Sequence, residues 1–277
     1  MTVGILGLGL IGGSFAKAYS KAGHTVLAAN RSRSTLDFAI LSGDVSGELT
    51  DDNIGQCDIV LLCVYPGACI SFLKEKGQFI GPKPVVIDTC GTKREVVNAC
   101  MPLAEKHGFT FIGGHPMAGT QYSGYKYSKA NMFSGAPMVI VPPDFNDIEL
   151  LSRIKELLAP AGFGKITVTT AEKHDKMIAF TSQLAHVVSN AYVKSPCVKE
   201  HKGISAGSYK DMTRVAWLNP EMWAELFLDN ADNLSAELSG LIDELKKYKD
   251  AIDAGDREEL VELLREGKRM KEEADGR

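Results

Sequence analysis

Three glycines near the N-terminus constrain the fold of this chain more than any other feature. Gly7, Gly9 and Gly12 have the spacing G-x-G-x-x-G, between a predicted strand at residues 3–6 and a predicted helix at residues 14–21. A second predicted strand follows at residues 25–29. In this context the first glycine permits a tight turn, the second lets a pyrophosphate approach the backbone, and the third lets helix and strand pack closely. The N-terminus of the helix also attracts anions. The sequence therefore predicts a dinucleotide-binding βαβ unit.

The end of the second predicted strand indicates which dinucleotide binds. NAD sites usually have Asp or Glu there, which binds the ribose 2′-hydroxyl, whereas this chain has Asn30, Arg31, Ser32 and Arg33. Arginines can pair with a 2′-phosphate, and serine can hydrogen-bond it, so we expect NADP, with NAD as the alternative. Both arginines could instead lie on a solvated helix start. The residues expected to bind the cofactor are Gly7, Gly9, Leu10, Ile11, Gly12, Asn30, Arg31, Ser32, Arg33 and Val64.

Apolar strand patterns alternate with helical patterns up to about residue 170. Further strands are predicted at residues 58–64, 84–88, 109–112, 136–141 and 165–169. This alternation is typical of an α/β fold, a Rossmann-type doubly wound parallel sheet. After residue 171 only helical periodicity remains. We therefore expect a dinucleotide-binding domain at residues 1–170 and an all-helical substrate and dimerisation domain at residues 171–277.

Composition excludes several classes of function. The net charge is −4, and without a long basic run neither nucleic acid nor a membrane is expected as a partner. No apolar stretch reaches the roughly 18 residues of a membrane span, and the first strand begins too early to leave room for a signal peptide. The six cysteines form no C-x-x-C pair. We therefore expect no metal site and a cytoplasmic location.

His115 is the first candidate for chemistry. It follows the predicted strand at residues 109–112 in a glycine-rich loop, where open α/β sheets bind their ligands. A neutral imidazole there can accept a proton from a substrate hydroxyl. The alternative is a histidine that only satisfies backbone groups of a turn.

Two further candidates lie in the helical part. On a predicted helix at residues 172–194, the spacing of Asp175, Ser182 and His186 brings all three to one face, either to line a cavity or to form a network between helices. Arg214 lies among apolar residues and requires an anion, either Asp211 or a substrate carboxylate.

The C-terminal region has a long apolar stripe that favours a homodimer. We expect Pro220 to open a long amphipathic helix. Apolar residues recur there in three- and four-residue steps, namely Met222, Leu226, Phe227, Leu234, Leu238, Leu241, Ile242 and Leu245. Such a stripe in a small helical domain is expected to pack against a second subunit.

Taken together, these stretches resemble the prephenate dehydrogenase and arogenate dehydrogenase family of tyrosine biosynthesis, over nearly the whole chain. The resemblance rests on six motifs: GLGLIGGS at residues 7–14, VIDTCGTK at 86–93, GGHPMAGTQYSG at 113–124, HD at 174–175, SQLAH at 182–186 and DMTRVAWLNPEMW at 211–223. The family combines a Rossmann domain with a helical dimerisation domain.

The resemblance implies an oxidative decarboxylation. Prephenate would lose a hydride from C4 to the nicotinamide and its ring carboxylate as CO2, giving 4-hydroxyphenylpyruvate. By this resemblance, His115 polarises the C4 hydroxyl, and Thr92 stands where the family usually has a serine near that hydroxyl. Arg214 would bind the ring carboxylate, and Trp223 would form a pocket wall. The substrate-binding residues implied are Arg214, His186, Ser182, Asp175, Gln121 and Trp223.

Two departures from the family pattern and three alternatives remain. Gln121 stands where the family often has Glu, and Gln183 where it commonly has His. Arogenate is the rival substrate. A β-hydroxyacid dehydrogenase is a more distant alternative and would use Lys173 or Lys176 as its catalytic lysine. A cofactor-sensing dimer without catalysis is a third.

Overall fold

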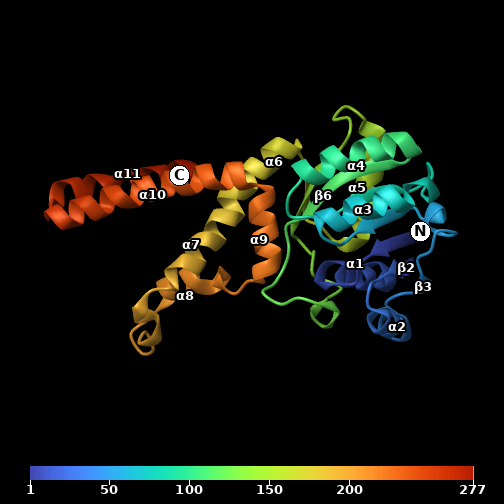
Figure 1. Cartoon of the computed structure of the whole chain (residues 1–277), viewed down its shortest axis with the longest axis horizontal. Coiled ribbons are helices and arrows are strands. Elements are labelled where there is room, and N and C mark those ends of the chain that lie inside the picture. The colour runs from blue at the N-terminus through green and yellow to red at the C-terminus, as the bar shows by residue number, and fades with distance from the viewer. Residues whose placement is uncertain (277) are drawn as a thin grey trace.

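The computed structural model describes residues 1–276, in which an eight-stranded sheet is followed by a helical part (Figure 1). The strand order is β3-β2-β1-β4-β5-β6-β7-β8. The strands are β1 (Thr2–Leu6), β2 (Thr25–Ala29), β3 (Gly47–Glu48), β4 (Ile59–Leu62), β5 (Val85–Asp88), β6 (Thr110–Pro116), β7 (Pro137–Val141) and β8 (Lys165–Val168). The two-residue strand β3 was not predicted.

The first six strands are parallel and are connected through helices. α1 (Leu10–Lys21), α3 (Pro66–Lys76) and α4 (Arg94–His107) follow β1, β4 and β5, and α2 (Arg33–Leu41) lies between β2 and β3. β1 pairs with β2 on one side and with β4 on the other, so the strand order reverses at β1. Ligands of open α/β sheets bind at the carboxyl ends of the strands beside such a switch point. The fold therefore places the glycine turn after β1 at the expected ligand edge.

The Rossmann-type α/β fold followed by helices is confirmed, but the end of the sheet differs from the prediction. β7 pairs with β6 antiparallel, and β8 is parallel to β7. A parallel return from β6 would need a crossover, usually a helix, and residues 117–136 contain only the short helical turn Tyr125–Tyr127. The chain therefore folds back directly, and α5 (Ile148–Leu158) connects β7 to β8.

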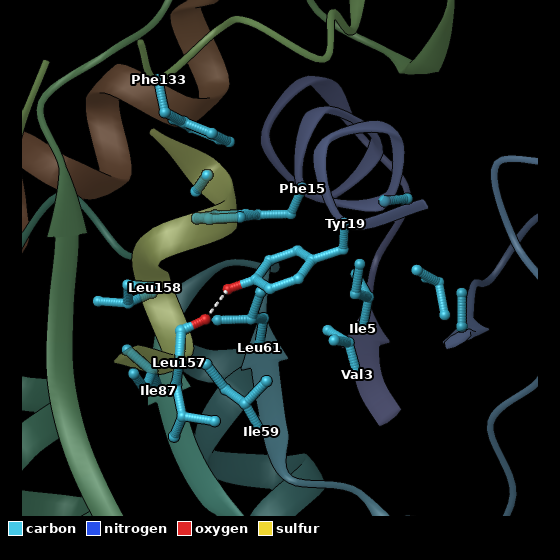
Figure 2. Packing of buried hydrophobic residues seen from close by; sticks show 14 of the residues in the cluster. Val3, Ile5, Phe15, Tyr19, Ile59, Leu61, Ile87, Phe133, Leu157 and Leu158 are labelled. Carbon is cyan, nitrogen blue, oxygen red and sulfur yellow. Dashed lines mark hydrogen bonds between the residues drawn. The ribbon is translucent and has the colours of Figure 1, made fainter. Parts of the chain in front are cut away.

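Side chains of α1, the helix that follows the glycine turn, pack into the core of the sheet domain, as Figure 2 shows. Phe15 and Tyr19 are fully buried. Phe15 stacks on Phe133 with ring centroids 4.1 Å apart, and the Tyr19 hydroxyl donates a hydrogen bond of 2.7 Å to the backbone oxygen of Leu157. Each fully buried large apolar side chain contributes about 1.5–3 kcal/mol. This packing holds the start of α1 fixed against the sheet.

The helical part contains two breaks where continuous helices were predicted. A π-helical turn at Ala179–Leu184 separates α6 (Ala171–Ile178) from α7 (Ala185–Tyr192), and Asn230 separates α9 (Pro220–Asp229) from α10 (Ala231–Ala254). The other helices are α8 (Gly207–Thr213) and α11 (Arg257–Asp275). α10 and α11 form a hairpin that extends away from the sheet (Figure 1). Within residues 1–276, no helix is both long and apolar enough to cross a membrane.

Candidate active site

The glycine turn has the shape that a dinucleotide needs. Gly7 has a φ of +89°, and a Cβ there would lie 2.6 Å from both the Cys63 oxygen and the Val64 side chain. A Cβ on Gly12 would lie 1.8 Å from the Gly7 oxygen, whereas one on Gly9 would meet nothing within 4 Å. Neighbouring atoms therefore leave no room for a side chain at Gly7 or Gly12, whereas the space beside Gly9 is free. No acidic residue occupies the first turn of α1, so its N–H groups can receive a pyrophosphate.

Two of the residues after β2, Asn30 and Ser32, accept hydrogen bonds from backbone N–H groups close to the expected cofactor site. The Asn30 side-chain oxygen accepts a hydrogen bond of 2.9 Å from the N–H of Leu8, inside the glycine turn. Ser32 is the N-cap of α2, and its hydroxyl accepts a hydrogen bond of 3.3 Å from the N–H of Thr35. Serine at this position satisfies a helix donor that would otherwise lack a partner. Both side chains shape the ribose edge of the expected cofactor site.

The two arginines of this loop differ in their partners. Arg33 is exposed and pairs with Asp37 at 2.8 Å and with Glu48 at 2.7 Å. Arg31 is also exposed and makes no ion pair with another residue in the described part of the chain. Exposed pairs are weak, but two carboxylates still reduce the positive field that Arg33 offers to an anion. Arg31 is the better placed of the two to receive a 2′-phosphate.

A chain of hydrogen bonds joins His115 to a second histidine and a carboxylate. Nδ1 of His115 lies 2.9 Å from Nε2 of His174, and Nδ1 of His174 lies 2.7 Å from Oδ1 of Asp175. Because a carboxylate only accepts hydrogen bonds, Nδ1 of His174 carries a proton and its Nε2 accepts. His115 then donates from Nδ1. Its Nε2 is left with a lone pair that can accept a proton.

Asp175 lies behind the histidines rather than at an open surface. It is fully buried. Its Oδ1 accepts a hydrogen bond of 2.7 Å from the N–H of Lys93, and its Oδ2 accepts one of 2.9 Å from the N–H of Arg94. A carboxylate at the N-terminus of α4 is stabilised by the free N–H groups and the helix dipole. Burial alone would raise the pKa of Asp175, but the hydrogen bonds from His174, Arg94 and Lys93 hold that pKa below its usual value.

The surroundings keep both histidines neutral. The pKa of His115 lies well below its usual value because of burial, the neighbouring His174 and the charge of Lys93. Burial also lowers the pKa of His174, although the hydrogen bond with Asp175 acts in the opposite direction. A neutral imidazole at pH 7 is the form that can act as a general base.

His115 itself lies in a strand, which corrects the loop predicted from the sequence. β6 continues through Pro116, and His115 is opposite Val139 of β7. The antiparallel return of β7 provides the pairing that extends β6 beyond residue 112. A strand holds a side chain more rigidly than a loop does, which suits a residue that must meet a substrate at a fixed distance.

A second group of candidate residues gathers around His186. Nδ1 of His186 donates a hydrogen bond of 2.9 Å to the backbone oxygen of Val215, and its ring lies on Trp223 with centroids 3.8 Å apart. Burial lowers the pKa of His186, and the nearby charge of Arg214 acts in the same direction. Arg214 is exposed, and no ion pair with Asp211 is present within the described residues. The structure therefore brings together His186, Trp223 and Arg214, with the arginine open to an external anion.

The predicted helix that would place Asp175, Ser182 and His186 on one face is interrupted between them. The π-helical turn at Ala179–Leu184 widens the helix between them, so a period of 3.6 residues does not carry across it. Asp175 contacts the start of α4, whereas His186 contacts Val215. Ser182 is half-buried within the turn. π-Helical turns are frequent at functional sites.

Thr92 and Gln121 are not joined to the histidine pair within residues 1–276. Thr92 is 1% exposed, and its hydroxyl donates a hydrogen bond of 3.4 Å to Oδ2 of Asp229 in α9. Gln121 is exposed in the long connection between β6 and β7. Lys173 and Lys176 are exposed on α6.

A buried polar network that the sequence did not indicate joins the two parts of the chain. Asn230 is fully buried, and its side-chain N–H groups donate to the oxygen of Asp175 and to the side chain of Gln183, both at 2.8 Å. Gln183 donates in turn to the oxygen of Leu226 at 2.7 Å. Arg94 donates to the Asn230 side chain at 3.0 Å. Gln183, which stands where the family commonly has His, is therefore part of a buried hydrogen-bond network.

Comparison with known proteins identifies the family. The model of the prephenate dehydrogenase nucleotide-binding domain matches residues 15–167, and the model of the prephenate dehydrogenase dimerization domain matches residues 170–266. Together they cover far more than half of the chain. The resemblance predicted from the sequence motifs is therefore confirmed.

Relatives and solved structures agree over the full length. Cyclohexadienyl dehydrogenase of Zymomonas mobilis is 30% identical over 280 residues, which cover 97% of this chain and 94% of that protein. The crystal structure of Synechocystis arogenate dehydrogenase has a TM-score of 0.81 and 28% identity, covering 98% of this chain and 99% of that one. Prephenate dehydrogenase of A. aeolicus, in complex with hydroxyphenyl propionate and NAD+, has a TM-score of 0.84 and 28% identity, covering 99% and 98%. The chain belongs to the prephenate dehydrogenase family of pyridine-nucleotide-dependent oxidoreductases.

Proposed function

We propose that this enzyme converts prephenate to 4-hydroxyphenylpyruvate by oxidative decarboxylation, with arogenate as the alternative substrate. The observation that carries the proposal is the chain from His115 through His174 to Asp175. It leaves Nε2 of His115 unprotonated on a strand of the sheet whose ligand edge also carries the glycine turn. That arrangement suits the removal of a proton from a hydroxyl next to a hydride acceptor.

His115 is the proposed general base. Its Nε2 accepts the proton of the C4 hydroxyl while the hydride leaves C4, and a C4 carbonyl forms. A nicotinamide cofactor, when bound, accepts that hydride. The C–C bond to the ring carboxylate then breaks, CO2 leaves, and the electron pair of that bond makes the ring aromatic, with the C4 oxygen as a phenolate. The His115 imidazolium returns its proton to this oxygen, which gives the phenol of the product. Asp175 stabilises the imidazolium charge through His174, so its role is positioning rather than substrate contact.

The cluster around His186 is the proposed substrate pocket. Arg214 binds a substrate carboxylate, for which its exposed guanidinium has no competing partner within residues 1–276. Trp223 and His186 form an apolar wall beside it. Ser182 in the π-helical turn, Gln121 in the β6–β7 connection and the Thr92 hydroxyl are the remaining proposed contacts, and closure of the connection over the substrate would bring Gln121 in.

NADP is the proposed cofactor. Arg31 supports this choice because it has no carboxylate partner in the described chain, and no acidic residue follows β2 directly. The pairing of Arg33 with Asp37 and Glu48 makes Arg33 the weaker contributor. NAD is the alternative. Gly7, Gly9, Leu10, Ile11, Gly12 and Val64 would hold the pyrophosphate and nicotinamide portions.

A homodimer formed through the C-terminal helices is also proposed. Large apolar side chains on α10 and α11 remain exposed in the single chain, including Ile242, Leu245, Ile252, Leu264 and Met270. Several large apolar side chains exposed on one pair of helices support an interface there. The division of the chain near residue 170 into a cofactor domain and a substrate and dimerisation domain accompanies this proposal.

A four-way assay of initial rates tests the reaction. Prephenate or arogenate is combined with NAD+ or NADP+, and the absorbance of the reduced cofactor is followed. Activity on prephenate with NADP+ preferred is expected, and activity only with arogenate would retain the mechanism and change the substrate. Activity with none of the four would overturn the proposal and favour the hydroxyacid dehydrogenase alternative, with Lys173 and Lys176 as the residues to change next.

Substitution of His115 tests the mechanism. His115→Asn is expected to lower kcat/KM by about 10²- to 10⁴-fold, the usual contribution of general acid–base catalysis, without weakening cofactor binding. His24→Asn is the matched control, because His24 precedes β2 at the opposite edge of the sheet, where it contacts the N-terminus. Full activity of the His115 variant would contradict the assignment of the base, and a cofactor-sensing dimer would then be the better description.

A further inference from the structure

A buried ion pair lies directly behind His115. Lys93 and Asp88 are both fully buried, and Nζ of Lys93 is bonded to Oδ2 of Asp88. Nζ of Lys93 also donates a hydrogen bond of 2.6 Å to the backbone oxygen of Gly114, and Oδ1 of Asp88 accepts one of 3.0 Å from the N–H of Gly114. The pair therefore holds both backbone groups of the residue that precedes His115.

The hydrogen bonds to Gly114 lie just beyond the point where the parallel pairing of β5 with β6 ends. The pairing of β5 with β6 runs from Val85 with Thr110 to Ile87 with Ile112. Beyond that point the side chains of Asp88 and Lys93 replace a strand partner. A Cβ on Gly114 would lie 2.3 Å from the backbone oxygen of Asp88, so glycine allows the end of β5 to approach this closely. The backbone beside His115 is thus held by β7 on one side and by charged side chains on the side where the pairing with β5 has ended.

The charge of Lys93 also reaches the histidines. It lowers the pKa of His115, after burial and His174, and it lowers the pKa of His174 as well. The carboxylates act in the opposite direction on His174, through the hydrogen bond with Asp175 and the more distant charge of Asp88. Burial, His174 and the charge of Lys93 therefore all oppose the protonation of His115.

We infer that Lys93, together with Asp88, is a positioning residue for catalysis: the pair fixes the backbone that presents His115 and places a buried charge behind its imidazole. The inference rests on the role of His115 proposed above. A fully buried ion pair is rarely required for stability, since apolar residues of similar volume can often replace it. Apolar residues would not supply a charge beside the base or two hydrogen bonds to Gly114.

Three variants test this role. Lys93→Met removes the charge and the bond to Gly114 at nearly unchanged volume. Because it leaves Asp88 buried without its partner, the double variant Asp88→Asn with Lys93→Met removes both charges and serves if the single one does not fold. Lys76→Met is the control with the same change in net charge, since Lys76 pairs with Asp51 near the surface at the end of α3.

The first measurement is the pH dependence of kcat and kcat/KM. Loss of the Lys93 charge is expected to move the acidic limb of both profiles to higher pH. Loosening of the backbone is expected to lower kcat by about 10- to 100-fold, as small displacements of reacting groups do, with a smaller change in KM. The control should leave the profile and both constants unchanged.

The second measurement observes the imidazole without relying on activity. Histidine ring signals are followed by NMR against pH, and His115 is assigned by the loss of its signal in His115→Asn. Its titration is expected at higher pH in the Lys93 variants than in the wild type. A folded variant, single or double, with unchanged titration and an unchanged acidic limb would overturn the inference. An active His115→Asn variant would instead overturn the proposed base, so the two failures are distinguishable.

Discussion

Which nitrogen of each histidine carries the proton determines what His115 can do. The carboxylate of Asp175 fixes the proton on Nδ1 of His174, and this tautomer fixes the proton on Nδ1 of His115. The reacting nitrogen is therefore controlled from two residues away. Asp175 also accepts N–H groups of α4, so the same side chain orients the histidines and anchors a helix.

Asp175→Asn tests this control. An amide can donate to His174 and so favour the wrong tautomer, as in catalytic triads, where the same change is very costly. We expect kcat to fall by about 10²- to 10⁴-fold, on the scale of general base catalysis, with cofactor binding retained. Asp232→Asn is the control, because Asp232 is an exposed partner of Arg94. Equal losses in the two variants would show that disturbance around Arg94, not the tautomer, is responsible.

The preference for NADP+ over NAD+ is expected to depend on the arginines of the loop after β2. Arg31→Ala is expected to lower kcat/KM with NADP+ by about tenfold or more and to leave that with NAD+ nearly unchanged, because a charge-assisted hydrogen bond contributes roughly 1.5–3 kcal/mol. Arg33→Ala is expected to have the smaller effect, since Arg33 is engaged by Asp37 and Glu48. The check is steady-state kinetics with both cofactors. Equal kcat/KM for the two cofactors in the wild type would contradict the NADP proposal.

Position along the chain was enough to single out His115, because the carboxyl end of a predicted strand is a ligand edge. The partners of His115 were not predictable in the same way. His174 is 59 residues away in sequence, and no local pattern records that the two rings meet. From the sequence, Asp88 belongs to a predicted strand and Lys93 to the loop after it. Their burial as an ion pair was not predictable, because lysine is almost never fully buried unless it is paired.

The main difference between the predicted and observed helices is that two of the predicted helices are interrupted. The predicted helices at residues 172–194 and from Pro220 onward have continuous helical periodicity, and in the structure each is divided. Asn230 explains one division: its side chain is buried and bonded to Asp175, Gln183 and Arg94. Periodicity reports which residues are apolar, but it does not report that one polar side chain is pulled into a network between helices.

Asn230→Ala tests the importance of this joint. The Gln183 side-chain oxygen would lose its donor, and a buried group left without a partner costs about 1–3 kcal/mol. The Asp175 backbone oxygen would keep the N–H of Ala179 as its donor. The free energy of unfolding by urea should fall by about that amount or more. Asn233→Ala is the matched control on the same helix, since Asn233 is half-buried and within residues 1–276 its side chain hydrogen-bonds only to that of Asn230. An equal effect of both substitutions would contradict a special role for Asn230.

At the scale of the whole molecule, the sequence predicted the α/β sheet, the helical part and the glycine turn, because each depends on local periodicity and spacing. The antiparallel return of β7 depends on the absence of a crossover helix from residues 117–136, and the alternation of strand and helix patterns elsewhere in the domain predicted a parallel sheet. The pairing of the exposed apolar residues of α10 and α11 with a second copy of the chain depends on the geometry of an interface, which periodicity does not specify.

Sedimentation tests the proposed dimer. At micromolar concentration the wild type should sediment as a dimer, and Ile242→Asp combined with Leu245→Asp should sediment as a monomer, because charged groups are costly in a dry apolar interface. These residues are 44% and 56% exposed in the single chain. Leu41→Asp is the control, being 86% exposed but located on α2 in the sheet domain. A wild type that is monomeric under these conditions would contradict the dimer.

The buried neutral histidines predict how the stability of the whole protein depends on pH. The pKa values of His115 and His174 are lowered in the folded state. In the unfolded chain the pKa of each is near the usual value for histidine, about 6.5. As the pH falls below that value, the unfolded state binds more protons than the folded state. The free energy of unfolding therefore decreases on acidification and is greatest above about pH 6.5.

Urea unfolding between pH 7.5 and 5.5, at constant protein concentration, measures this slope. Each histidine that stays neutral only in the folded state contributes up to about 1.4 kcal/mol per pH unit. The wild type should lose stability throughout the lower part of the range, and His115→Asn should have a smaller slope because one such group is removed. A flat profile in the wild type would mean that the histidines can take up protons in the folded protein, which would also remove the basis for a neutral base at the site.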